Sequence, residues 1–177
     1  MQKQLALRPL DMAVAIALAV LPPERRTFAE VGHALGLSAS TVHQSVSRLS
    51  KAGLLLSGEK APNVTALRSF LVHGARHAFP PMLGKESRGV PTAHAGPLLR
   101  EEFDGDQPLV WPDIDGAVRG TALTPLYPQA TTLPRRAPRV YAALTLVDAI
   151  RAGQSRERNL AVHLLEQALQ PGEGAGA

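Results

Sequence analysis

The chain of 177 residues contains no cysteine. This absence excludes disulfide bonds, zinc sites with thiolate ligands and cysteine nucleophiles together. It also suits the reducing cytoplasm, because structural disulfides belong mainly to oxidising compartments. We therefore expect a cytoplasmic protein.

Aromatic residues are scarce, at 4% of the chain, although 45% of the residues are hydrophobic. The interior must therefore consist mainly of leucine, valine and alanine, a composition typical of packed helices. Fifteen prolines and fifteen glycines do not suit an all-helical protein, and they are concentrated in the middle of the chain. We predict a mainly α fold with helical ends and an irregular centre.

No hydrophobic run is long enough to cross a membrane. The longest, over residues 12–21, spans about ten residues, whereas a membrane helix needs about twenty. Two prolines and a charged segment follow it, in place of the small residues of a signal-peptide cleavage site. We expect a soluble chain without a membrane partner.

Acidic residues are in modest deficit, and the net charge is +4. Seven of the 19 basic residues and only four of the 15 acidic residues lie within residues 1–60, so the excess is concentrated in the N-terminal third. A local excess of positive charge favours an anionic partner such as a nucleic acid.

Motifs of enzymes and metal sites are missing or incomplete. The chain has no Gly-x-Ser-x-Gly elbow of a serine hydrolase. His73 and His77 have the spacing of two metal ligands on a helix, but Gly74 stands where a zinc peptidase has its glutamate. The central aspartates lack the spacing of a calcium loop: Asp104, Asp106, Asp113 and Asp115. We predict no enzymatic activity, no metal and no cofactor.

Hydrophobic periodicity and capping residues predict the elements and their limits. We expect helices over residues 7–21, 27–35, 38–52, 63–79 and 139–152, and a last helix capped by Ser155. A short strand at 54–57 and a turn at 57–62 follow the third helix, and candidate strands lie at 109–111 and 117–126. This pattern divides the chain into segments 1–79, 80–138 and 139–170.

Residues 27–55 have the organisation of two helices joined by a tight turn. Thr27 and Glu30 form a capping-box pair, and Gly36 ends the first helix. We expect small Ala29 where the second helix crosses the first, and Leu37 in the angle between them. The second helix should then bury three aliphatic residues at spacings of four and three: Val42, Val46 and Leu49.

The opposite side of that second helix carries hydrogen-bonding side chains and no carboxylate, as a helix in the groove of a polyanion requires. Gln44 can pair with adenine, and Arg48 can meet guanine or a phosphate. The predicted DNA-contacting residues, including two from flanking segments, are Thr27, Ser38, Ser40, Thr41, His43, Gln44, Ser47, Arg48, Lys51 and Lys60.

This N-terminal third resembles the winged helix-turn-helix of bacterial transcriptional regulators, in particular the MarR-like group. The segments that carry the resemblance are Leu35-Gly-Leu-Ser38, Val46-x-Arg48-Leu49 and Lys51-x-Gly53-Leu54-Leu55. The resemblance implies that the second helix enters the major groove, that a wing follows, and that a homodimer reads an inverted repeat. The wing expected here is short, and Lys60 is its single basic residue.

We therefore expect a winged helix-turn-helix with a small β component and a C-terminal extension that is partly helical and partly irregular. The predicted function is sequence-specific binding of double-stranded DNA by a dimeric repressor. Dimerisation through the first helix and the closing helices would cover their apolar surface. The alternative is an antitoxin or adaptor that uses the winged helix, and its C-terminal half, to bind a protein partner.

Overall fold

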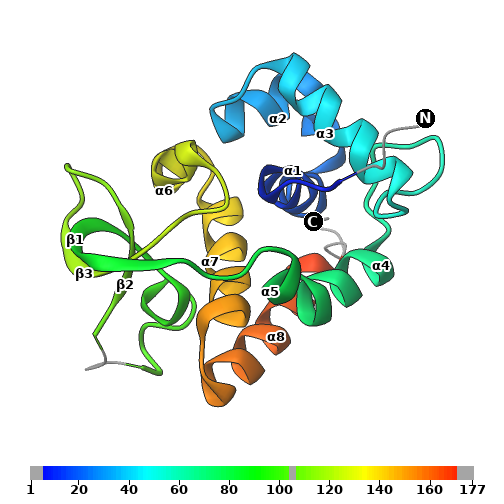
Figure 1. Cartoon of the computed structure of the whole chain (residues 1–177). Coiled ribbons are helices and arrows are strands. Elements are labelled where there is room, and N and C mark those ends of the chain that lie inside the picture. Colours follow the sequence, from blue (N-terminus) through cyan, green and yellow to red (C-terminus); the bar gives the residue numbers. More distant parts are fainter. Residues whose placement is uncertain (1–5, 104–106, 171–177) are drawn as a thin grey trace, which may run out of the picture.

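The computed structural model describes residues 6–103 and 107–170. Within these ranges the chain is mainly helical and has one small three-stranded sheet (Figure 1). The mainly α class predicted from composition is therefore confirmed. Of the helices in the described ranges, none combines the length and the hydrophobicity needed to pass through a lipid bilayer.

Helix α1 (Pro9–Val20) lies at the centre of the molecule. Every side chain from Met12 to Leu18 is fully buried. Helices α2 (Phe28–Leu35) and α3 (Ala39–Lys51) cover α1 from above in Figure 1, and α7 (Pro138–Ala152) and α8 (Ser155–Leu169) complete its surroundings. The prediction that α1 contributes to a dimer surface is therefore wrong, because the chain itself encloses this helix.

A continuous helix runs from Val64 to Ala78, in agreement with the prediction for residues 63–79. It consists of α4 (Val64–Ser69), a π-helical turn (Phe70–Gly74) and α5 (Ala75–Ala78). The side chain of Asn63 caps its start by accepting a hydrogen bond from the Ala66 amide at 3.2 Å. In the π turn, the backbone amide of Ala75 donates a hydrogen bond to the carbonyl of Phe70, five residues earlier.

Three strands form a small closed barrel in the centre of the chain. Strand β1 (Leu83–Thr92) pairs antiparallel with both β2 (Leu109–Pro112) and β3 (Val118–Leu123), and β2 and β3 run parallel over a short stretch. Glycine allows the strands to approach closely. A Cβ atom on Gly89 would lie 2.1 Å from the Trp111 carbonyl oxygen, so a larger residue would push β1 and β2 apart.

The central segment 80–138 is more ordered than the sequence predicts. The candidate strands at 109–111 and 117–126 correspond to β2 and β3, whereas β1 is not predicted. The first half of β1 is exposed and includes Lys85, Glu86 and Arg88, and Pro91 lies near its end. These residues hide the alternation of polar and apolar positions that identifies a half-buried strand.

A buried polar network attaches the barrel to α7. The carboxylate of Asp148 accepts hydrogen bonds from Thr92 Oγ1 at 2.8 Å, from Trp111 Nε1 at 2.6 Å and from Arg151 Nη1 at 2.6 Å. Burial raises the pKa of Asp148, and the charge of Arg151 and the three hydrogen bonds act in the opposite direction. Arg151 Nε also donates to the carbonyl of Phe79, so the end of α5 joins the same network.

The closing helices lie close to where the sequence predicts them. Helix α7 ends before Gly153, and α8 begins at Ser155. The prediction that Ser155 is the cap is wrong. Gln154 occupies that position, and its backbone amide donates a hydrogen bond to Glu157 Oε2 at 3.1 Å. Side chains from all three predicted segments belong to one buried cluster, so these segments share a core.

Candidate nucleic-acid interface

A cap at the start of α2 and two glycines, Gly32 and Gly36, set the geometry of the α2–α3 pair. Thr27 Oγ1 accepts a hydrogen bond from the Glu30 amide at 3.1 Å, and Gly36 ends α2 in the left-handed conformation, with φ of 69°. A Cβ atom on Gly32 would lie 2.6 Å from the Leu37 carbonyl oxygen. The chain therefore crosses α2 at Gly32, and the expectation of Ala29 at this position is wrong, since Ala29 is exposed.

Two hydroxyl groups fix the start of α3. Ser38 Oγ accepts a hydrogen bond from the Thr41 amide at 3.1 Å and lies 2.8 Å from Thr41 Oγ1. Ser38 is thus the helix cap that the sequence predicts. Ser38 is exposed and Thr41 is half-buried, so both lie where the N-terminus of α3 meets solvent.

The buried side of α3 differs in one position from the prediction. Val42 and Leu49 are fully buried, as expected. Val46 is only half-buried, and Ser45 is fully buried instead. The physical reason is a polar partner beneath the helix: Ser45 Oγ donates a 2.5 Å hydrogen bond to Asp11 Oδ1 of α1.

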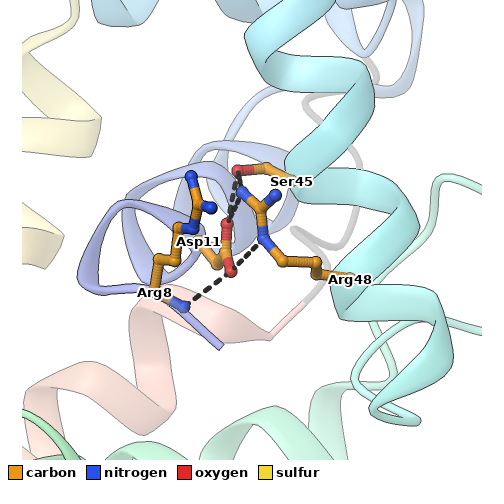
Figure 2. A network of polar contacts seen from close by, with 4 residues as sticks. All are labelled: Arg8, Asp11, Ser45 and Arg48. Atoms are coloured by element: carbon orange, nitrogen blue, oxygen red, sulfur yellow. Dashed lines mark hydrogen bonds and ion pairs between the residues drawn. The ribbon is translucent and has the colours of Figure 1, made fainter. Parts of the chain in front are cut away.

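Arg48 completes this polar contact between α1 and α3 (Figure 2). Its Nε donates to Asp11 Oδ2 at 2.8 Å and its Nη2 donates to Asp11 Oδ1 at 2.7 Å, which is the two-pronged geometry of a strong pair. The amide of Arg8 donates to the same carboxylate at 2.8 Å. Hydrogen bonding to Asp11 raises the pKa of Arg48, although partial burial acts in the opposite direction.

The prediction that Arg48 lies on the outward side of α3 is therefore wrong. Its side chain is 15% exposed and that of Asp11 is fully buried. A buried carboxylate requires a cation and donors, and Arg48 is the cation that α3 provides. Arg48 fixes α3 on α1 and does not extend into the solvent.

The outward side of α3 keeps five of the predicted contact residues. They are exposed, and none is acidic: Ser40, His43, Gln44, Ser47 and Lys51. Helix α3 as a whole contains no aspartate or glutamate. This surface can donate and accept hydrogen bonds, and its one permanent charge is positive.

An aromatic residue that the sequence does not single out lies beside this surface. The ring of Phe28 packs edge-on against His43, with 5.2 Å between ring centroids. Lys60 Nζ lies 4.8 Å from the centre of the same ring. The sequence shows only that a phenylalanine directly follows the Thr27 cap, and the structure shows that it is half-buried. Phe28 thus positions both His43 and Lys60.

The loop of residues 54–63 is a tight turn with minimal β structure. The expected strand at 54–57 is reduced to one isolated bridge between Leu55 and Pro62. Gly58 takes the left-handed conformation at the tip, with φ of 76°. Lys60 and Thr27, two of the predicted contact residues, line a shallow groove of about 220 Å³ together with Arg26 and Glu59.

Those residues considered for metal binding that the structure describes do not gather into a site. Among the described residues, no three histidine, aspartate or glutamate side chains come together as metal ligands. Asp104 and Asp106 lie outside the described residues. Asp113 Oδ1 accepts a hydrogen bond from the Asp115 amide at 3.0 Å, which is a local turn contact.

The structure thus brings most of the predicted contact residues to one side of α3 and its flanks. They sit on a helix whose opposite side is held by Val42, Leu49 and the buried Asp11–Arg48 pair. Searches against protein-family models, curated proteins and solved structures found no match to this chain.

Proposed function

We propose that this chain is a sequence-specific double-stranded DNA-binding transcriptional regulator of the winged helix-turn-helix type, and that α3 enters the major groove. The observation that carries the proposal is the outward side of α3, where exposed hydrogen-bonding side chains and Lys51 occur without any carboxylate. A polyanion repels carboxylates, so such a surface suits a DNA groove.

The dimensions and rigidity of α3 agree with this role. Its 13 residues make a rod of about 20 Å, and the major groove, about 12 Å wide, admits an α-helix. The pair between Asp11 and Arg48 fixes the helix on the core, which preorganises the side chains that would read bases. Thr27, Ser38 and Lys60 flank the helix and would contact phosphates.

Gln44 is the best placed residue for reading a base, because it is exposed near the middle of α3 and its amide can pair with adenine. Gln44→Ala should weaken binding to the preferred site by about 1–3 kcal/mol and relax the preference at one base position. Selection from random duplexes, followed by anisotropy titrations, measures both effects. Gln167→Ala, at an exposed position of α8, is the matched control and should bind as the wild type does. Equal affinity of the two variants for the preferred site would show that Gln44 does not contact DNA.

Lys51 should act differently, as a phosphate contact. Lys51→Ala should weaken binding to all sequences alike and lower the slope of log affinity against log salt by about one unit. Titrations at several salt concentrations, with a selected and an unrelated duplex, provide the slopes. An unchanged slope would show that Lys51 does not touch the DNA backbone.

The mass of the complex gives the number of chains per duplex, and two chains on a symmetric site would support the homodimer that the resemblance implies.

A protein-binding adaptor is the second candidate, and exposed apolar side chains on and beside the barrel favour it. Ile114 is 89% exposed, Met82 67% and Leu83 61%. Met82 and Leu83 are neighbours at the start of β1, whereas Ile114 lies beside Ser87 and Arg88 farther along the strand, so they offer a partner protein two separate apolar contacts. DNA affinity that is undetectable, or that does not respond to salt, would favour this function over the first.

A further inference from the structure

A second candidate site lies between the π-helical turn with α5 and the helix α8. It is a groove of about 430 Å³, within the range of small-molecule sites. Its lining comes from two segments distant in the sequence: Val72, His73, Arg76, His77, Arg158, Asn159 and Val162. The groove is separate from the α3 surface, since α1 lies between α3 and α8 in Figure 1.

The lining is cationic and rich in hydrogen-bond donors. It contains two arginines, two histidines and one asparagine, and no acidic side chain is among the described residues that form it. A metal cation would be repelled by Arg76 and Arg158, so His73 and His77 do not act as metal ligands here. A carboxylate or phosphate matches this donor set, because a guanidinium group binds such anions through paired hydrogen bonds.

Arg158 carries the argument further, because no described residue pairs with its charge. Its Nη2 donates to the Gly153 carbonyl at 2.9 Å. Its Nε is buried and has no hydrogen-bond partner among the described residues. The same residues contain no carboxylate paired with Arg158, whereas Arg68 pairs with Glu166 elsewhere between α4 and α8. A half-buried guanidinium without an anion is costly, and a bound anion would offset that cost.

The backbone beside the groove supports the same inference. The π-helical turn Phe70–Gly74 includes His73 and interrupts the regular α-helical hydrogen bonds. Such turns cost stability and occur frequently at functional sites.

We propose that this groove binds a small free anion through a phosphate or carboxylate group, held by Arg76 and Arg158 with help from Asn159 and the two histidines. This site does not depend on DNA binding by α3, and the two can be tested separately.

The test is a titration of the full chain, without DNA, with inorganic phosphate, with succinate and with chloride at matched ionic strength. Calorimetry gives affinities, and amide chemical shifts in NMR spectra show where binding occurs. We expect saturable binding of phosphate or succinate, with shifts confined to residues around the groove, and no saturable effect of chloride. The anion that binds with the higher affinity, phosphate or succinate, identifies the ligand class.

Arg76→Gln and Arg158→Gln should each weaken binding at least about tenfold, because each removes a charge-assisted contact. Arg156→Gln is the matched control: it removes the same charge from the same helix outside the groove, and should bind as the wild type does. Asn159→Asp adds a carboxylate at an exposed position and should abolish binding, even if Arg158→Gln fails to fold. Absence of saturable binding, or equal weakening by Arg156→Gln, would overturn the proposal.

Discussion

Arg48→Ala should lower the free energy of unfolding by about 3–5 kcal/mol, because it leaves a buried carboxylate without its cation. The carboxylate of Asp11 is fully buried, and among the described residues it would keep the Ser45 hydroxyl and the Arg8 backbone amide as donors. Chemical denaturation followed by circular dichroism measures the loss. The variant should also bind DNA poorly, since α3 would no longer be fixed on α1.

Two further variants separate this structural role from a role in reading DNA. Arg119→Ala is the matched control. The side chain of Arg119 is 65% exposed and that of its partner Glu86 is 54% exposed, so their ion pair should contribute less than about 1 kcal/mol to stability. The double variant Asp11→Ala with Arg48→Ala should lose less stability than the sum of the single variants, because no unpaired charge remains buried. If Arg48→Ala were as stable as Arg119→Ala and still lost DNA affinity, Arg48 would contact DNA, as predicted from the sequence.

Asp148→Ala should be comparably destabilising, by about 3–5 kcal/mol. It removes the only carboxylate that the described residues pair with Arg151, whose side chain is 4% exposed, and it leaves Trp111 Nε1 without its acceptor. Trp111 is the single tryptophan of the chain, so its fluorescence reports on this network directly. We expect a red-shifted emission at neutral pH and an earlier unfolding transition in urea.

The control for this prediction is Asp115→Ala, which removes an exposed carboxylate of the same barrel and should change stability by no more than about 0.5 kcal/mol. Replacing the pair by apolar residues of similar size, Asp148→Leu with Arg151→Met, should recover part of the lost stability. An Asp148→Ala variant with wild-type emission and stability would show that the network contributes little to holding the barrel on α7.

The elements defined by local chemistry could be predicted from the sequence. Thr27 and Ser38 cap helices because their hydroxyl oxygens accept hydrogen bonds from amides three residues later, a contact that needs no information from the rest of the chain. Gly36 ends α2 because the left-handed conformation there disfavours other residues. Val42 and Leu49 are buried because helical spacing places them together.

The features that depend on distant segments could not be predicted. Arg48 looks like a surface residue by helical periodicity, and its true position follows from Asp11, 37 residues away on another helix. Ser45 is buried for the same reason, and Val46 is displaced from the core. Strand β1 is also missed, because pairing with two later strands holds it together, and its own pattern is masked by charged residues. Local spacing does not show which partner a side chain will find after folding.

The enclosed position of α1 has a consequence for how the protein is made. A ribosome releases α1 long before α7 and α8, so this apolar helix stays without its final neighbours until most of the chain has been synthesised. Because α7 and α8 complete the surroundings of α1, and α1 supplies the carboxylate that fixes α3, the core beneath α3 is complete only after α7 and α8 have been synthesised.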